Sequence, residues 1–123
     1  MRRDRNAEGE FWEEAASAYL ARQGVRTLLR RYRCRLGELD LVCTDDASLI
    51  VVEVRARSST RHASAADSVD YFKRRRIVQA TRHLLMRHPT WGERPVRFDV
   101  VAIERIESAE PRIAWIRGAF DAD

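Results

Sequence analysis

The sequence predicts an α/β protein with a mixed central sheet flanked by helices, in the order α-β-β-β-α-β-β. Two segments, at residues 7–23 and 67–87, have apolar residues at helical spacing. Five shorter segments are rich in Val, Ile and Leu, which is typical of strands. The chain has 123 residues, 45% of them apolar and 34% charged. We therefore expect one globular domain that spans residues 1–123.

The first helix is expected over residues 7–23, with Asn6 as its N-cap and Gly24 after its last turn. Two neighbouring rows of side chains at i, i+4 spacing would face the sheet. Glu13 lies at the edge of this stripe. The rows are Phe11, Ala15 and Tyr19, and beside them Trp12, Ala16 and Leu20.

Three strands should follow, at residues 25–33, 36–44 and 48–57, and the breaks between them are short enough for hairpins. A polar loop is expected over residues 58–66. The second helix would end before His88-Pro89, because the residue before a proline disfavours helix. A strand at residues 96–106 and a short strand at 113–116 complete the pattern. Arg97 and Asp99 share a face of the fourth strand, which favours a structural ion pair.

The second helix holds the only lysine of the chain, Lys73. At 100° per residue Lys73 falls within the apolar stripe, whereas Arg74 and Arg75 turn away from it. A lysine that faces the core needs a carboxylate partner or a displaced pKa, unless its stem carries the amine out to solvent. The stripe comprises Val69, Phe72, Ile77, Ala80 and Leu84.

Carboxylates interrupt two of the apolar strands. Asp40 shares a face with Val42, and Glu53 shares a face with Arg55 on the next strand. If these strands form a hairpin, Asp40 and Glu53 converge across it. Buried ionised carboxylates cost several kcal/mol without a partner, and their oxygens suit Mg²⁺ or Mn²⁺. Such a pocket is what phosphodiester hydrolysis requires. The alternative is a structural Glu53–Arg55 ion pair, with Asp40 capping a turn.

Composition bounds the setting of the protein. The longest apolar run is far shorter than a membrane helix, and no apolar core follows the N-terminal arginines as in a signal peptide. We therefore expect a cytoplasmic protein with no membrane association and with Cys34 and Cys43 reduced. The net charge of +4 permits binding to a polyanion without requiring it. The candidates for phosphate contacts are Arg57, Arg61, Arg74 and Arg75.

Several motifs together resemble the YraN-type family of bacterial proteins. They are G-E-L-D-L-V at residues 37–42, V-V-E-V-R-A-R at 51–57, Lys73 with Arg76-Ile77, R-F-D-V-V-A at 97–102, and Trp115-Ile116 with Ala119-Phe120. They occur in the same order and at the same separations, and the likeness covers nearly the whole chain. The resemblance implies a restriction-endonuclease-like fold, similar to that of the Holliday-junction resolvases.

The resemblance also implies roles for individual residues. Asp40 and Glu53 match the acids that bind Mg²⁺ or Mn²⁺, and Glu13 matches the acid on the first helix. Arg55 stands where the superfamily has its catalytic lysine. Arginine stays protonated, so it cannot accept a proton as lysine can. We hypothesise that Lys73 supplies the ammonium group that position 55 lacks. No small-molecule cofactor is implied.

Three functions remain open from the sequence. The first is a divalent-metal-dependent endonuclease acting on DNA, with branched or recombination structures as candidate substrates and, by analogy with the resolvases, a homodimeric state. The second is a non-catalytic nucleic-acid-binding module that kept the fold, and Arg55 is the feature that favours it. The third is a dimeric interaction subunit that serves another protein. Fold alone does not decide between them.

Overall fold

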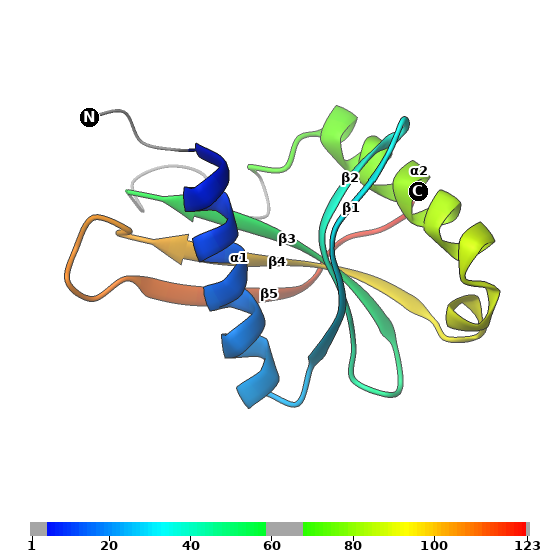
Figure 1. Ribbon diagram of the computed structural model, residues 1–123, viewed down its shortest axis with the longest axis horizontal. Coiled ribbons are helices and arrows are strands. Elements are labelled where there is room, and N and C mark those ends of the chain that lie inside the picture. The colour runs from blue at the N-terminus through cyan, green and yellow to red at the C-terminus, as the bar shows by residue number, and fades with distance from the viewer. Residues whose placement is uncertain (1–4, 59–67, 123) are drawn as a thin grey trace.

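The computed structural model describes residues 5–58 and 68–122, and it contains a five-stranded mixed sheet between two helices (Figure 1). The strands lie in the order β1-β2-β3-β4-β5. Neighbouring strands are antiparallel except β3 and β4, which are parallel. The predicted α/β class and element order are therefore confirmed. The helix bounds are α1 Arg5–Arg22 and α2 Tyr71–Arg87, and the strand bounds are β1 Arg26–Cys34, β2 Gly37–Thr44, β3 Leu49–Arg57, β4 Val96–Glu104 and β5 Arg112–Phe120.

Helix α1 begins two residues earlier than expected. It starts at Arg5, so Asn6 lies inside the helix and its predicted role as the N-cap is wrong. The first residues of the helix have a partner outside it, since Arg31 of β1 donates to the carbonyl oxygen of Asn6 at 3.2 Å. Gly24 follows the helix with a φ of +85°, as expected for a residue that ends a helix in the left-handed region.

Helix α2 begins later than expected, at Tyr71, because Asp70 caps it. The Asp70 carboxylate accepts from the backbone N–H of Lys73 at 2.9 Å. Phe72 was predicted on the buried stripe, and this is wrong: it is 74% exposed. The reason is angular, because the buried face of α2 is centred between Ile77 and Leu84, and Phe72 lies on the opposite side of the helix.

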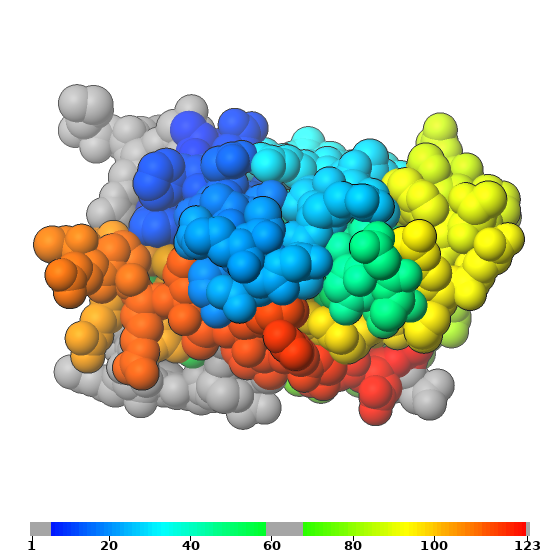
Figure 2. Space-filling model, turned by 90° about the horizontal axis from the view of Figure 1, so that it is seen from below, coloured from blue at the N-terminus to red at the C-terminus, as the bar shows by residue number. Residues whose placement is uncertain are grey.

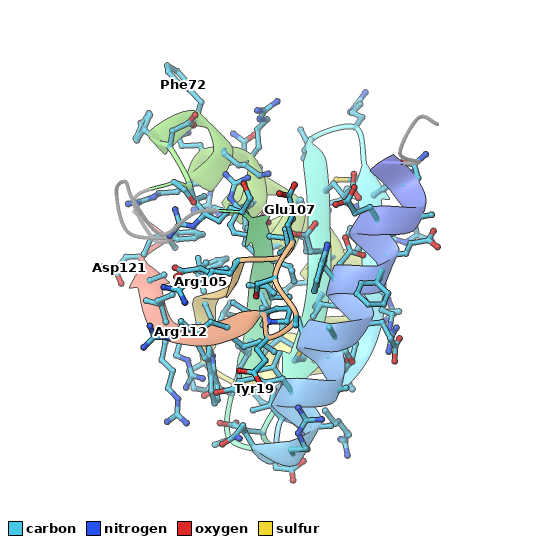
Figure 3. All side chains as sticks on the ribbon, turned by 90° about the vertical axis from the view of Figure 1, so that its left-hand side faces the viewer. Tyr19, Phe72, Arg105, Glu107, Arg112 and Asp121 are labelled. Atoms are coloured by element: carbon cyan, nitrogen blue, oxygen red, sulfur yellow. The ribbon has the colours of Figure 1, made fainter. Side chains whose placement is uncertain are left out.

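The sheet separates two layers of the core. One layer packs under α2 and the other under α1, and Figure 3 shows the two helices on opposite sides of the sheet. Figure 2 shows the α1 face from outside, where α1 adjoins the β4–β5 hairpin. Among the described helices, none is both long and apolar enough to cross a membrane. The central residues of the first layer are Val42, Val51, Ile77, Leu84 and Val100, and those of the second are Ala16, Leu20, Leu41, Val52 and Val101.

The C-terminal strand is longer than predicted, and a buried aspartate ties it to β4. Asp99 is fully buried and accepts two hydrogen bonds from Arg97, at 2.9 and 3.0 Å. It also accepts from the indole N–H of Trp115 and from the backbone N–H of Gly118, both at 2.9 Å. The predicted Arg97–Asp99 pair is thus confirmed. Asp99 thus accepts four hydrogen bonds, and it bridges an irregularity in the pairing of β4 with β5.

Candidate active site

The candidate site lies where β2 and β3 separate. Their pairing ends at Leu41 and Val52, after which the β1–β2 hairpin turns away from β3 (Figure 1). The next residues on the two strands are Asp40 and Glu53. A carboxylate oxygen of Asp40 accepts from the backbone N–H of Val54 at 2.9 Å, so this side chain replaces the next bond of the ladder. The fork between the strands therefore carries both predicted acids.

Two hollows of about 340 and 270 Å³ meet at this fork. Asp40, Glu53 and Lys73 line both of them, and we call the two hollows together the acid cleft. Glu13 and Arg55 line the larger hollow. Residues from both helices and from two strands thus reach one opening, as the sequence analysis predicted for Asp40, Glu53 and Lys73.

Lys73 reaches the cleft from the first turn of α2. Its Nζ lies 2.8 Å from an Oε atom of Glu53, so the two side chains form an ion pair. Glu53 has only 5% of its side chain exposed, whereas Lys73 has 36%. The expected carboxylate partner of Lys73 is confirmed. Lys73 therefore does not extend into solvent as a solitary charge.

Gly37 sets the distance between the β1–β2 hairpin and α2. A Cβ atom at this position would lie 2.8 Å from the carbonyl oxygen of Arg76. Real Cβ atoms do not approach backbone that closely, so only glycine fits without displacement of α2 or β2. This close contact holds Asp40, three residues along β2, near the helix that carries Lys73.

The Asp40 carboxyl group has an unusual proton affinity. Its pKa is raised from 3.8 to about 7, first by burial and then by the neighbouring Glu53, through its charge and through a hydrogen bond between the two carboxyl groups. The Val54 N–H and the charge of Lys73 act in the opposite direction but do not compensate. Among the described residues, Asp40 has no ion pair. Asp40 and Glu53 therefore lie side by side, with Lys73 paired to Glu53.

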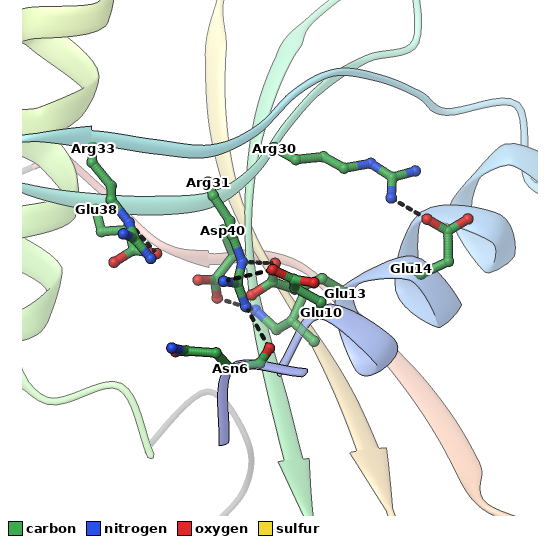
Figure 4. A network of polar contacts seen from close by, with 10 residues as sticks. Asn6, Glu10, Glu13, Glu14, Arg30, Arg31, Arg33, Glu38 and Asp40 are labelled. Atoms are coloured by element: carbon green, nitrogen blue, oxygen red, sulfur yellow. Dashed lines mark hydrogen bonds and ion pairs between the residues drawn. The ribbon is translucent and has the colours of Figure 1, made fainter. Parts of the chain in front are cut away.

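Arg31 is a site residue that the sequence analysis missed. Its Nε donates to Glu13 at 2.9 Å, and a terminal nitrogen lies 3.4 Å from Glu10 (Figure 4). Burial raises the pKa of Glu13, and the charge of Asp40 adds to this effect, although Arg31 opposes it. Glu13 thus lies at the acid cleft, as predicted, but its carboxylate is held by an arginine.

The hairpin register places Arg31 opposite Asp40, since Arg30 pairs with Leu41 and Tyr32 with Leu39. The sequence analysis expected the break between these strands at residues 34–35, and counting back from it sets Arg31 opposite Glu38. The turn lies one residue later, between Cys34 and Gly37, so the pairing with Asp40 was missed. The backbone of Arg31 was not predicted either: it has a φ of +51°, in the left-handed region. Such a conformation is unfavourable for a residue with a Cβ and is found at functional sites.

Arg55 does not pair with Glu53, which was the structural alternative considered from the sequence. Among the described residues, Glu53 pairs with Lys73 instead. A terminal nitrogen of Arg55 donates to the carbonyl oxygen of Ser68 at 2.8 Å, and its buried Nε has no hydrogen-bond partner within the part of the chain that the structure describes. Arg55 thus joins the end of β3 to the segment before α2. The other part of that alternative, Asp40 capping a turn, is also wrong: Asp40 lies within β2, and one of its oxygens accepts from the Val54 N–H of β3.

The four arginines predicted to contact nucleic acid do not gather at the acid cleft. Arg57 pairs with Glu104 at 3.2 Å, and Arg61 lies outside the described residues. Arg74 donates to the carbonyl oxygen of Val69. Arg74 and Arg75 line a separate hollow of about 640 Å³ between α2 and the C-terminal end of β5. Arg75 is exposed, as predicted, but Arg74 is half-buried and its guanidinium carbon lies 5.3 Å from the centroid of the Phe120 ring, so the prediction that it turns away is wrong.

The carboxylates of the acid cleft are the side chains that could hold a divalent cation. Within residues 5–58 and 68–122, no three His, Cys, Asp or Glu side chains gather as a metal-binding group. Two adjacent carboxylates do, and Mg²⁺ is commonly held by one or two carboxylates, waters and the phosphates of a substrate. The pKa of Asp40 is raised by burial and by the charge of Glu53, and a cation between the two carboxylates would oppose both effects. The donor set therefore fits a divalent cation held by Asp40 and Glu53.

Comparison with known proteins agrees with the resemblance found in the sequence. The family described as "Uncharacterised protein family UPF0102" matches residues 12–103. The chain is 42% identical to the UPF0102 protein of Pseudomonas paraeruginosa over 115 residues, which are 93% of this chain and 92% of that protein. It is 36% identical to a UPF0102 protein of Legionella pneumophila over 114 residues, which are 93% and 94% of the two chains. It is 41% identical to that of Pseudomonas putida over 113 residues, 92% of each.

The matched segment runs from Trp12 to Ile103, and so includes Glu13, Asp40, Glu53 and Lys73. The YraN-type resemblance is thereby confirmed at the level of the family. Because the match covers the sheet strands and helices that form the acid cleft, the site belongs to the shared part of these proteins. The chain is a member of the UPF0102 family.

Proposed function

We propose that this protein is a divalent-cation-dependent nuclease that hydrolyses phosphodiester bonds in DNA, on a restriction-endonuclease-like fold. The observation that carries the proposal is the pairing of Asp40 and Glu53 at the strand fork, with Lys73 bonded to Glu53 at 2.8 Å. Two acids on a mixed sheet with an ammonium group beside them are the parts that the fold superfamily uses, and here the ammonium group comes from α2. The sheet topology, with helices on both faces, is compatible with that fold.

The proposed roles follow from the chemistry of each side chain. Asp40 and Glu53 would hold Mg²⁺ or Mn²⁺, which supplies neutralisation of the phosphate and acidification of a bound water. Lys73 compensates the charge of Glu53 and presents N–H donors to a phosphate or a water in the cleft. Arg55 is held by the Ser68 carbonyl group beside the cleft and contributes positive charge there. No role as a proton acceptor is assigned to it, since arginine keeps its proton.

Cleavage assays with matched variants test this proposal. Asp40→Asn and Glu53→Gln keep size and shape but remove the charges that bind the cation, so each should lower Mn²⁺-dependent cleavage of branched or single-stranded DNA by at least about a hundredfold. Arg55→Lys should retain more activity than Lys73→Met, since Lys73 is the proposed ammonium donor. Equal cleavage by wild type and Asp40→Asn would reject the enzymatic function.

A second function is favoured by a specific observation, the hydrogen bond from Arg31 to Glu13. This bond occupies the acid that the resemblance assigns as a third ligand. A nucleic-acid-binding module that has lost catalysis would keep such a pair permanently. DNA binding without cation uptake or cleavage would support the module. If the protein bound no DNA even at low salt, where phosphate contacts are strongest, this would support the third function, an interaction subunit.

A further inference from the structure

Two aromatic rings project from the first turn of α2 into solvent. Tyr71 is 62% exposed and Phe72 is 74% exposed, and Figure 3 shows Phe72 pointing away from the rest of the molecule. Their ring centroids lie 5.6 Å apart at an interplanar angle of 75°. Exposed rings this close together form an apolar patch that faces solvent. Such patches mark places where another molecule binds.

Arginines surround these rings. The Arg75 guanidinium carbon lies 5.9 Å from the centroid of the Tyr71 ring. A shallow hollow of about 540 Å³ is lined by both rings, Arg75, Arg76 and Gln79, and none of these residues is acidic. Aromatic faces interleaved with positive charge are what proteins use to bind unpaired bases and the phosphates between them. We call this set, without Gln79, the aromatic–arginine surface.

The aromatic–arginine surface is continuous with the acid cleft. Arg76 lines both the shallow hollow and the hollow that holds Asp40 and Glu53. Lys73 follows Phe72 directly in the chain and points into the cleft on the other side of the helix turn. A nucleic-acid strand with one phosphate in the cleft would therefore cross Arg76 to reach the two rings.

We propose that the aromatic–arginine surface binds an unpaired strand next to the phosphate in the acid cleft. The inference rests on the proposed function for the position of that phosphate, and it narrows the substrate to DNA with a single-stranded segment. Duplex DNA does not fit this role, because its bases already stack on one another and offer no free face to a ring. A second copy of the chain fits less well, since a symmetric contact would set the arginines against each other.

The test is binding of full-length protein to fluorescein-labelled oligothymidylate, and to a duplex of the same length, at low salt in EDTA. Phe72→Ala should weaken oligothymidylate binding by at least about fivefold, since stacking of one base on one ring is worth that much. Its effect on duplex binding should be under about twofold. Phe72→Trp, which keeps an aromatic ring at this position, should bind oligothymidylate with the affinity of wild type. The control is Met86→Ala, which removes an apolar side chain that is 80% exposed on the same helix and should change neither affinity.

Two results would overturn the inference. The first is an equal or absent effect of Phe72→Ala on the two DNAs. The second is a wild-type dimer in sedimentation velocity that Phe72→Ala dissociates while DNA affinity stays the same, which would make this surface a contact between copies. Failure of the proposed function is seen separately. If Phe72-dependent strand binding persists but no cleavage depends on Asp40, the inference holds and the enzyme does not.

Discussion

Two regions of the same sheet bury carboxylates in opposite surroundings. Asp99, on β4, receives two hydrogen bonds from Arg97, one from Trp115 and one from Gly118, so its charge is matched on every side. Asp40, at the strand fork, receives a single backbone bond and has another acid beside it. The first group stabilises the β4–β5 pairing. The second holds charge that the protein alone does not compensate.

The difference separates a structural carboxylate from a candidate functional one. Burial penalises both groups, but hydrogen bonds and a guanidinium offset the penalty at Asp99. At Asp40 burial and the charge of Glu53 raise the pKa to about 7. A side chain kept in such an unfavourable state, in a cleft, is a functional-site candidate on physical grounds. The two regions should therefore respond in opposite directions when their charge is removed.

The largest effect is expected at the compensated carboxylate. Asp99→Ala would leave Arg97, the Trp115 indole and the Gly118 N–H without their acceptor in the core, so we expect a loss of about 3–5 kcal/mol in the free energy of unfolding. Urea denaturation at neutral pH measures it. The control Asp46→Asn changes an exposed aspartate and should stay within about 0.5 kcal/mol. A loss below about 1 kcal/mol for Asp99→Ala would contradict a structural role.

The opposite sign is expected at the strand fork. Because the pKa of Asp40 is raised from 3.8 to about 7, the folded protein holds a proton between those values that the unfolded chain releases. Folding stability therefore falls as pH rises from about 4 to 7. Asp40→Asn keeps an acceptor for Val54 without the charge.

Asp40→Asn should thus be more stable than wild type by on the order of 2 kcal/mol at pH 8, and about equal to it at pH 4. The measurement is urea denaturation in EDTA across this pH range, so that no divalent cation stabilises the ionised form. A variant that is less stable at pH 8, or a difference that does not change with pH, would contradict an uncompensated charge at Asp40.

A smaller effect is expected from the ion pair that crosses the acid cleft. In a double-mutant cycle of Lys73→Met and Glu53→Gln, we expect a coupling energy of about 1–2 kcal/mol, less than for a fully buried pair because Lys73 is partly exposed. Arg75→Met, on the exposed side of the same helix, is the matched control and should not couple to Glu53→Gln. A coupling energy near zero would show that the ion pair positions the two side chains without stabilising the fold.

The smallest effect is expected at the contact between the hairpin and α2. Gly37→Ala brings a methyl group against the Arg76 carbonyl, so it should cost about 1 kcal/mol and displace the strand that carries Asp40. Gly92→Ala is the control, since its Cβ would meet nothing closer than 3.9 Å. Thermal denaturation compares the two variants. A larger loss of stability for Gly92→Ala than for Gly37→Ala would contradict a restrictive contact between Gly37 and α2.

The sequence predicted much of this arrangement because side-chain periodicity is a local property. The alternation in the strands was enough to bring Asp40 and Glu53 to one fork, and helical spacing was enough to aim Lys73 at them. Arg97 and Asp99, two residues apart on one strand, were predicted as a pair for the same reason. In each case the partners lie on one strand, on adjacent strands or on the helix that packs over them.

What the sequence did not predict depends on contacts between distant segments. Arg31 meets Glu13 only because α1 packs over the first hairpin. The capping of α2 by Asp70 shifted the helix start, and the angular position of Phe72 follows from which helix face the sheet selects. The donors from Trp115 and Gly118 to Asp99 required the full length of β5, which was predicted to be shorter.

The central claim is that the acid cleft binds a divalent cation through Asp40. Calorimetric titration of full-length protein with Mn²⁺ near pH 6.5, in buffers of different ionisation enthalpy, tests it most directly. We predict one bound ion and release of a proton, because Asp40 must lose the proton that its pKa of about 7 retains. Asp40→Asn should abolish both. Mn²⁺ uptake that is absent in wild type, or identical in Asp40→Asn, would contradict the account.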